Sequence, residues 1–357
     1  MGAVELLSDV DITSEYAAVR NGGAGLIDLS SRGRLLVSGS ESLQFLNGLI
    51  TNDMKTLEPN RWMAAAFPNV QGRLVAAVRV LHLKWQQENS GLQTNGYLID
   101  TEAPTHEAVL KTIGRFTLAG DFHVTNLTQE TRLLSIQGAK ASELIGEVFS
   151  ESAGALERGQ VLTTEFGNQP VCLIRATHTS EDGFDLVIAA SVADQLREEL
   201  ISGGATPVGE VAAEVLRIEA GEARFGIDMD ETNVVSEINL DDAISFTKGC
   251  YIGQEIIARI KYRGHVAKKL VGLIFAGIAE VKPGAKLVTS EGKEIGRITS
   301  VTGSPMLERT IGLGYLKYDY LAPGTEVLVA DQDLKASVVE LPFVKGSWQT
   351  AAATNWV

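Results

Sequence analysis

Strand-like and helix-like segments alternate along the first two thirds of the chain. Runs rich in strand formers predict strands at 33–39, 74–83, 96–100, 122–127, 132–137, 171–176 and 184–189. Apolar residues at helical spacing predict helices at 107–116, 142–149, 192–201 and 211–220. Another helix is expected after the N-cap candidates Ser40 and Ser42, with Leu43, Leu46, Leu49 and Ile50 on one side. This succession of strands and helices occurs roughly twice, which favours two α+β units, each an antiparallel sheet with helices on one face.

The pattern changes after about residue 266, where helical spacing disappears. Short strands are expected at 270–275, 286–289, 296–301, 311–315, 326–329 and 336–340. Pro-Gly and Glu-Gly pairs at 283–284, 291–292 and 323–324 predict turns between several of them. This arrangement is typical of a small antiparallel barrel or sandwich. The last residues are expected to form a loose tail, unless its two tryptophans dock on the body.

The predicted fold is therefore α+β, and the length of 357 residues suits two or three domains. Residues 1–130 are assigned to a first α+β unit and residues 131–265 to a second. Residues 266–345 are assigned to the C-terminal β-barrel, and residues 346–357 to the loose tail.

Composition and charge exclude several classes of protein. The net charge of −14 disfavours a general nucleic-acid binder, because phosphate contacts need clustered Lys and Arg. The apolar runs are too short for a membrane span, and the first residues do not resemble a signal peptide. The two cysteines, Cys172 and Cys250, form neither a disulfide framework nor a Cys/His cluster. A reducing cytoplasm is therefore the expected location.

The segment 247–265 (TKGCYIGQEIIARIKYRGH) carries the candidate chemistry. Gln254 to Ile260 is predicted to be helical, which places Cys250 at or just before a helix N-terminus, with Lys248 nearby. Both features are expected to stabilise a thiolate at Cys250. The alternative is a small buried hydrophobic side chain, and this is the preferred interpretation of Cys172.

The same region is basic. Six Lys and Arg residues and one acid lie between Lys248 and Lys269, a local balance of +5. Such a run is usually a solvated face; an anionic ligand, an anionic partner or RNA is the less common interpretation. A steep salt dependence of RNA binding would support the last of these.

These residues resemble a known signature. Lys248, Gly249, Cys250, Tyr251, Gly253, Gln254, Glu255 and Arg259 match every fixed position of the K-G-C-[FY]-x-G-Q-E-x-x-x-R motif of the YgfZ family. Residues 25–39 and 216–226 resemble the N-terminal signature and the central R-x-E-A-G motif of the wider glycine-cleavage T-protein superfamily. Residues 295–305 and 311–315 are similar to its barrel domain.

The resemblance covers nearly the whole chain up to about residue 343. It implies two ferredoxin-like units and a C-terminal barrel around a central folate channel. It also implies a tetrahydrofolate or a one-carbon derivative as cofactor, held by Glu219, with Asp28, Arg73, Tyr251 and Arg259 as further candidate contacts.

The candidate contacts have structural alternatives. Glu219 lies in the R-x-E-A-G motif, where a carboxylate can accept two donors from the pterin edge. The alternative is an exposed helix residue paired with Arg217 or Arg224. Asp28 either lines the channel or caps a turn.

One departure separates two branches of the superfamily. Aminomethyltransferases carry an acidic pair in a Gly-Gly-x-x-Asp-Asp-like run, where an Asp assists methylene transfer. The matching run, residues 69–77, ends in Ala76 and Ala77 and resembles the Gly-Arg form of YgfZ relatives, with Arg73 after Gly72. Alanine can neither move protons nor steady positive charge at a folate nitrogen. A tight turn between two strands is the alternative interpretation of this run.

Two functions follow from the resemblance. The first is a folate-binding accessory protein in iron–sulfur cluster assembly or repair, which supports tRNA-modifying iron–sulfur enzymes and engages assembly proteins or client enzymes. Cys250 and Lys248 would then be the reactive residues, and any cluster would be transient, because clusters usually need four thiolates. The second is a folate-dependent aminomethyl transferase.

Overall fold

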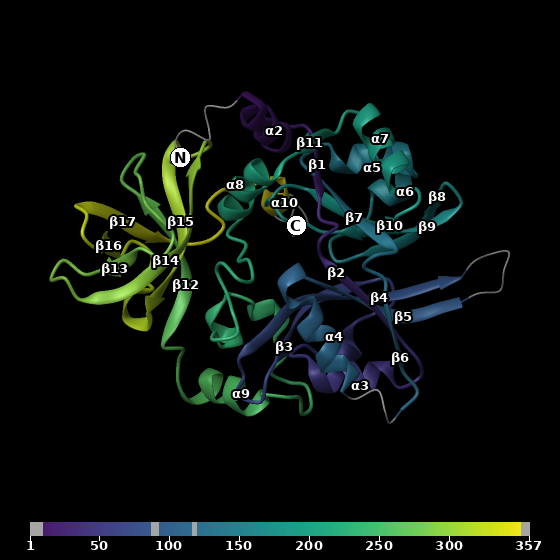
Figure 1. Ribbon diagram of the computed structural model, residues 1–357, viewed down its shortest axis with the longest axis horizontal. Coiled ribbons are helices and arrows are strands. Elements are labelled where there is room, and N and C mark those ends of the chain that lie inside the picture. The colour runs from purple at the N-terminus through teal and green to yellow at the C-terminus, as the bar shows by residue number, and fades with distance from the viewer. Residues whose placement is uncertain (1–9, 87–92, 116–119, 351–357) are drawn as a thin grey trace, which may run out of the picture.

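The computed structural model describes residues 10–86, 93–115 and 120–350, which form two stacked sheets and a separate barrel (Figure 1). The predicted α+β class with a C-terminal antiparallel barrel is confirmed. In Figure 1 the barrel lies to the left, and the sheets lie one above the other to the right. Within the described ranges, no helix has the length and apolar character that a bilayer span requires.

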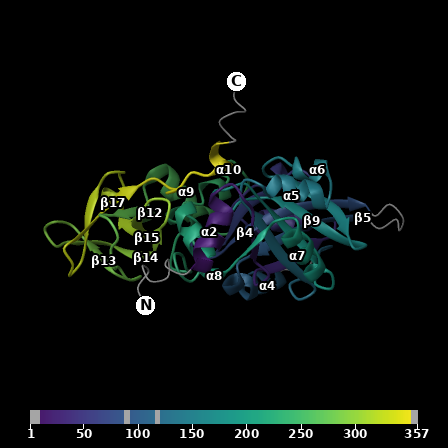
Figure 2. The same cartoon turned by 90° about the horizontal axis from the view of Figure 1, so that it is seen from above.

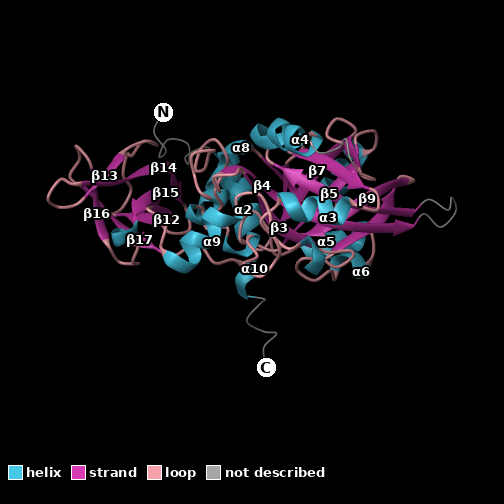
Figure 3. Cartoon of the chain, turned by 90° about the horizontal axis from the view of Figure 1, so that it is seen from below, coloured by secondary structure: helices cyan, strands magenta, loops and turns pink. Residues whose placement is uncertain are grey.

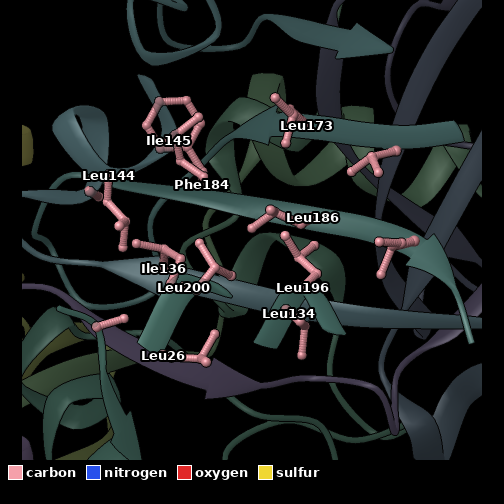
Figure 4. Packing of buried hydrophobic residues seen from close by; sticks show 14 of the residues in the cluster. Leu26, Leu134, Ile136, Leu144, Ile145, Leu173, Phe184, Leu186, Leu196 and Leu200 are labelled. Carbon is pink, nitrogen blue, oxygen red and sulfur yellow. The ribbon is translucent and has the colours of Figure 1, made fainter. Parts of the chain in front are cut away.

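The upper sheet has six strands in the order β11-β1-β7-β10-β9-β8. Their bounds are β1 (Gly25–Asp28), β7 (Thr131–Gln137), β8 (Val161–Phe166), β9 (Gln169–Arg175), β10 (Gly183–Ala189) and β11 (Thr206–Val208). Helices α5 (Ala141–Val148), α6 (Glu151–Gly154) and α7 (Ala193–Ser202) cover its outer face. Alternate residues of β7 and β10, such as Leu134, Phe184 and Leu186, pack against these helices (Figure 4).

The lower sheet has five antiparallel strands in the order β3-β4-β5-β2-β6. Their bounds are β2 (Gly33–Ser38), β3 (Trp62–Pro68), β4 (Leu74–Gln86), β5 (Gln93–Thr101) and β6 (His123–Asn126). Helices α3 (Ser42–Leu49) and α4 (His106–Gly114) pack on its outer face through a second core, with Leu46, Val80 and Ile99 among its buried members.

The inner faces of the two sheets are directed toward each other. Leu81 and Leu98 of the lower sheet join Leu133, Ile174 and Val187 of the upper sheet in one apolar cluster. Because side chains alternate along a strand, the neighbours of these residues at i±2 also project into the space between the sheets. Polar residues at those positions form the candidate site.

The barrel closes in the order β12-β15-β14-β13-β16-β17. Its strands are β12 (Lys268–Phe275), β13 (Lys286–Val288), β14 (Glu294–Ser304), β15 (Arg309–Lys317), β16 (Glu326–Val329) and β17 (Leu334–Val339). Closure leaves no free edge, so a short chain segment can fold around its own core.

Helices connect the barrel with the sheets. They are α2 (Val10–Arg20), α8 (Glu210–Ala220), α9 (Gln254–Arg263) and α10 (Ser347–Thr350). Helices α2 and α8 lie between the barrel and the sheets when seen from above (Figure 2), and the view from below shows α8 and α9 in the same middle layer (Figure 3). Apolar residues of β3, β4, α8, α9 and the barrel share one core cluster, which joins these parts.

Several predicted elements differ from the structure. The N-cap of α3 is Glu41, whose side chain makes no capping bond, whereas Ser40 Oγ donates to Asp121 and Ser42 Oγ donates to the Gly39 carbonyl. The predicted end of α4 at Phe116 lies outside the described residues. Strands β1, β3, β8 and β11 and helices α2, α6 and α10 were not predicted. The alanines of β3 are poor strand formers, and tertiary pairing with β4 overrides this preference.

The predicted boundary between the two α+β units at residue 130 remains a prediction. Strand β1 lies in the range 1–130, but it pairs with β7 and β11 from the later range. The part of the tail that the structure describes contains α10, where the Trp348 ring lies 4.4 Å below the Arg158 guanidinium. This contact agrees with the alternative in which the tryptophans of the tail dock on the body of the protein. Residues 351–357 lie outside the described ranges.

Two glycines allow α9 to pack on the turn before β4. Gly253, at the N-cap of α9, has φ +77°, and a Cβ atom there would lie 2.4 Å from the Asn69 carbonyl oxygen. A Cβ atom at Gly72 would lie 3.1 Å from Ile256 of α9. Close backbone approach therefore explains both glycines without any chemistry.

We predict that Gly253→Ala lowers the free energy of unfolding by at least about 1 kcal/mol, because alanine is strained at this φ and its Cβ meets the Asn69 carbonyl. Gly249→Ala, in the same motif, is the control, because a Cβ atom there meets nothing within 4 Å. Urea denaturation of both variants measures the effect, and equal midpoints would contradict this packing role.

Candidate functional site

A buried chain of charges connects the two sheets. Arg79 of β4 donates from Nε to Asp100 Oδ2 of β5 at 2.7 Å, and its Nη1 lies 2.6 Å from Asp185 Oδ2 of β10. Arg32, in the segment between β1 and β2, adds a bidentate contact to Asp100 at 2.7 and 3.1 Å. The Arg79 guanidinium thus bridges the two sheets, and the Arg32 guanidinium holds Asp100 in place.

Both aspartates remain ionised although they are buried. Burial acts to raise the pKa of Asp100, but the guanidinium groups of Arg32 and Arg79 outweigh it and lower that pKa to about 2. For Asp185, burial is likewise outweighed by His178 and Arg79, so its pKa lies well below the usual range. The cluster therefore holds fixed negative charges in a position that water hardly reaches.

His178 connects the cluster with solvent. Its Nε2 lies 2.9 and 3.1 Å from the two carboxylate oxygens of Asp185, and 27% of its side-chain surface is exposed. Because Asp185 is a carboxylate and can only accept, Nε2 must carry the proton of this contact. Gln137 accepts a hydrogen bond from the His178 backbone and so fixes the loop.

Two further carboxylates, Glu222 and Glu102, lie near this cluster and have fewer direct contacts than Asp100 and Asp185. Glu222 follows the C-terminus of α8 and is exposed, yet its charge interacts with His178, Arg79 and Arg32. Glu102 follows β5 and accepts a hydrogen bond from the Phe225 backbone at 3.0 Å. Desolvation by the surrounding protein raises the pKa of the Glu102 carboxyl group.

A hollow of about 450 Å³ adjoins these groups. It is lined by the start of β4, the residues after Glu102 and the segment after α8, including Arg73, Thr105, Phe225 and Thr232. Phe225 both lines the hollow and contacts Glu102, so the hollow meets the charged cluster at that carboxylate. Its size is in the range of small-molecule sites.

Glu219 has a different environment from the one expected. It is fully buried, and Tyr16 donates to both carboxylate oxygens at 2.8 and 3.0 Å. Arg20 Nε and Ser304 Oγ donate to the same carboxylate at 3.0 and 2.5 Å. Protein donors occupy both oxygens, so the predicted pterin contact of Glu219 would require displacement of one of them.

The alternative interpretation of Glu219 also needs correction. The residue is not exposed, and its cationic partner is Arg20 of α2. Arg217 instead pairs with Glu214 and Asp228, and Arg224 pairs with Glu214.

The remaining predicted folate contacts are dispersed. Asp28 accepts from the Ser30 backbone and pairs with Arg197 of α7, as expected for a residue that stabilises a turn. Arg73 is exposed and lines the hollow. Tyr251 is buried, and burial raises the pKa of its phenol to about 12. Arg259 is exposed and is not among the residues that line the hollow.

The Cys250 motif has a clear structural component. Lys248 is buried, and its Nζ donates to the carbonyls of Asn47, Ile50 and Asn52 at 2.8, 2.9 and 2.6 Å. Burial lowers the pKa of Lys248 to about 8. The ammonium group is therefore engaged in the body of the protein, whereas Cys250 is exposed in the segment before α9.

The other motif residues support α9. Glu255 and Arg259 form an exposed pair along the helix at 2.8 Å, a contact of small energetic value. Gln254 begins the helix after Gly253, and Gly249 has open space around it. Among the residues that the structure describes, no three His, Cys, Asp or Glu side chains are arranged to hold a metal ion.

The two alanines that replace the acidic pair lie on different faces of β4. Ala76 is fully buried in the core beneath α3 and α4. Ala77 packs with the cluster that joins the barrel, and by alternation it shares the inner face of the sheet with Arg79. Only position 77 could therefore present a side chain to the site.

Sequence reasoning missed the charged cluster itself. Arg79, Asp100 and Asp185 each lie within a predicted apolar strand, and a charge at such a position is costly unless it is paired. That signal was present in the sequence, but it could not identify the partners, which come from three different strands.

Comparison with known proteins provides a family context for this arrangement. Residues 7–248 match the GCVT N-terminal domain, and residues 268–345 match the glycine cleavage T-protein C-terminal barrel domain. The chain is 30% identical to an aminomethyltransferase of Rubrobacter xylanophilus over 94% of this chain and 86% of that protein. A putative chloroplastic transferase of Arabidopsis thaliana is 26% identical over 96% and 76% of the two chains.

The fold has a solved counterpart. The crystal structure of the glycine cleavage system aminomethyltransferase T from Bartonella henselae is similar with a TM-score of 0.82 and 23% identity. The similarity covers 94% of this chain and 90% of that one. It supports the same arrangement of sheets and barrel.

We predict that an alkylating reagent at neutral pH labels Cys250 well before Cys172. Cys250 is exposed, whereas Cys172 lies between the sheets and burial raises the pKa of its thiol to about 12. Mass spectrometry of peptides after short exposure to iodoacetamide measures the order. Cys250→Ser is the control, and equal labelling of both native thiols would contradict the packing of Cys172.

Proposed function

This chain belongs to the glycine cleavage T-protein family, and on that premise we propose that it binds a reduced folate and acts in folate-dependent one-carbon transfer. The observation that carries the proposal is the charged cluster between the sheets, which reaches the partly exposed His178 and acts electrostatically on the exposed Glu222. A permanently charged, desolvated frame with a few accessible polar groups is typical of a small-molecule site.

The chemistry of a pterin suits these groups. Its pyrimidine edge presents N–H donors, and a carboxylate such as Glu222 can accept them in charge-assisted hydrogen bonds. Among the residues that the structure describes, none donates a hydrogen bond to the Glu222 carboxylate, in contrast to Glu219, which has donors from three residues. We therefore assign the pterin-binding carboxylate to Glu222 in this proposal.

The hollow next to Glu102 suits the remainder of a folate. It is open to solvent at Arg73, whose Nη1 donates to the Thr232 carbonyl at 3.3 Å. A folate tail ends in carboxylates, and an exposed guanidinium is an appropriate partner for them. Arg73 therefore keeps its predicted role as a folate contact within this proposal.

A second function is supported by a separate observation, the complete motif around the exposed Cys250. In this alternative the protein is a YgfZ-type accessory factor of iron–sulfur cluster assembly or repair in the cytoplasm. It would use folate and Cys250 to support client enzymes, including those that modify tRNA. The alanines at positions 76 and 77 favour this branch, because neither can assist a methylene transfer.

We predict that tetrahydrofolate binds the wild-type protein and that Glu222→Gln weakens binding at least tenfold. The variant keeps one acceptor oxygen but loses the second acceptor and the negative charge, and a hydrogen bond to a charged group is worth roughly 1.5–3 kcal/mol. Isothermal titration calorimetry measures the difference. Glu280→Gln, an exposed carboxylate on the barrel, is the control. Absence of binding up to millimolar tetrahydrofolate would refute the proposed function.

The accessory role makes a different prediction. Cys250→Ser should bind tetrahydrofolate like wild type, because Cys250 does not line the hollow, yet fail to restore iron–sulfur enzyme activity in a strain that lacks the protein. Cys172→Ala should lose stability on the order of 1 kcal/mol through the space it leaves, but still complement. Full complementation by Cys250→Ser would remove the thiol from this role.

A further inference from the structure

The end of β5 brings a carboxylate to the position that faces Ala77. Val78 of β4 pairs with Thr101 of β5, and Arg79 pairs with Asp100. Glu102 follows Thr101 with extended backbone angles, φ −65° and ψ 148°, so the alternation of side chains continues to it. Glu102 and Ala77 therefore both lie on the inner face, next to the bridge between Arg79 and Asp100.

Glu102 is held by one oxygen and leaves the other available. The Phe225 backbone donates to Oε2 at 3.0 Å, while Oε1 receives no hydrogen bond from the described part of the chain. The hollow is lined by Phe225, which contacts this carboxylate, and by Pro104 and Thr105, which follow Glu102 in the sequence. A ligand in the hollow can thus reach Oε1 while the backbone contact keeps the side chain in place.

The arginines around Glu102 form ion pairs with other acidic residues. Arg32, which approaches from the segment before β2, is bound to Asp100. Arg217 of α8 and Arg224 of the following loop are bound to Glu214. All three attract the negative charge of Glu102 from a distance, but none pairs with it.

The contrast with Asp100 on the same strand is informative. Asp100 has two guanidinium groups in direct contact, which hold its pKa at about 2. Glu102 has none, so desolvation prevails and raises its pKa. Neighbouring carboxyl groups whose pKa values are displaced in opposite directions are typical of an acid–base site, with one group as a fixed charge and the other as the proton carrier.

We propose that Glu102 is the residue that moves protons in the one-carbon transfer, a catalytic role that rests on the proposed folate-binding function. The inner face of β4 offers no acid at the facing position, because residue 77 is alanine. The carboxylate is instead supplied by the neighbouring strand.

The proton transfers balance within one turnover. The lone pair of a folate nitrogen forms the new bond to the one-carbon unit, and the bonding pair of the broken bond leaves with the donor heteroatom. Neutral Glu102 gives its proton to that heteroatom, and the resulting carboxylate takes the proton that the folate nitrogen loses. Glu102 therefore ends the step in the protonation state in which it began.

The first test uses tetrahydrofolate alone and needs no turnover. Calorimetric titrations between about pH 5 and 8, in buffers with different ionisation enthalpies, count the protons exchanged on binding. The bound ligand removes further water from Glu102, so wild type is expected to take up a proton that Glu102→Gln does not. The amide oxygen of the variant can still accept from the Phe225 backbone, and its unfolding midpoint verifies the fold.

The second test moves the carboxylate across the strand pair. Glu102→Gln should slow the condensation of formaldehyde with bound tetrahydrofolate on the order of 100-fold. The double variant Ala77→Asp with Glu102→Gln should recover part of that rate, because the facing position again presents an acid to the same space. Ala76→Asp with Glu102→Gln is the matched control, because residue 76 faces the opposite side of the sheet.

The outcomes separate the inference from the function it rests on. Binding with the same proton uptake in wild type and Glu102→Gln would overturn the role of Glu102 while leaving the folate site intact. Equal condensation rates in these two proteins would overturn it as well. Failure of the wild-type protein to bind tetrahydrofolate would overturn the proposed function itself. The inference is supported if Glu102→Gln loses both the proton uptake and the condensation rate, and if Ala77→Asp with Glu102→Gln recovers part of that rate.

Discussion

The ion pairs of Arg79 with Asp100 and Asp185 are the constraint on which the space between the sheets depends. A buried charge without its partner is strongly destabilising, so the two sheets must keep the spacing that lets one guanidinium reach both carboxylates. The apolar contacts around Leu81 and Leu98 fill the same layer on one side. On the polar side, His178 is partly exposed and Glu222 is exposed, and the candidate site lies there.

Buried polar contacts also fix the helices and loops that surround the space between the sheets. Buried Lys248 binds the segment before α9 to the end of α3 and the loop that follows it through three carbonyl groups, and Gly253 lets α9 approach the turn that carries Arg73. The buried network of Glu219 joins α2, α8 and the barrel. Motif residues that suggest chemistry in the sequence, such as Lys248 and Glu219, thus also hold the frame.

Prediction from sequence succeeded where the local pattern carries the information. The buried positions Leu46, Leu49 and Ile50 in and just after α3 follow from helical periodicity. The succession of short strands in the barrel follows from strand formers separated by turn signals. Strand β3 escaped because its alanines carry little strand preference, and only pairing with β4 makes it a strand. Glu219 was assigned to the ligand from its motif, although its surroundings give it protein donors instead.

The sequence by itself determined the fold class, the C-terminal barrel and the wider T-protein superfamily, because these depend on the local pattern of strand and helix formers and on motifs that are contiguous along the chain. The tertiary structure decided which acids meet which cations. Asp100 lies in β5 and Glu102 follows the strand, yet Asp100 is bound by two guanidinium groups, whereas one oxygen of Glu102 receives no hydrogen bond from the described residues and lies near a hollow. That difference arises from sheet register and from loops far away in sequence, and such long-range pairing leaves no periodic trace in the chain.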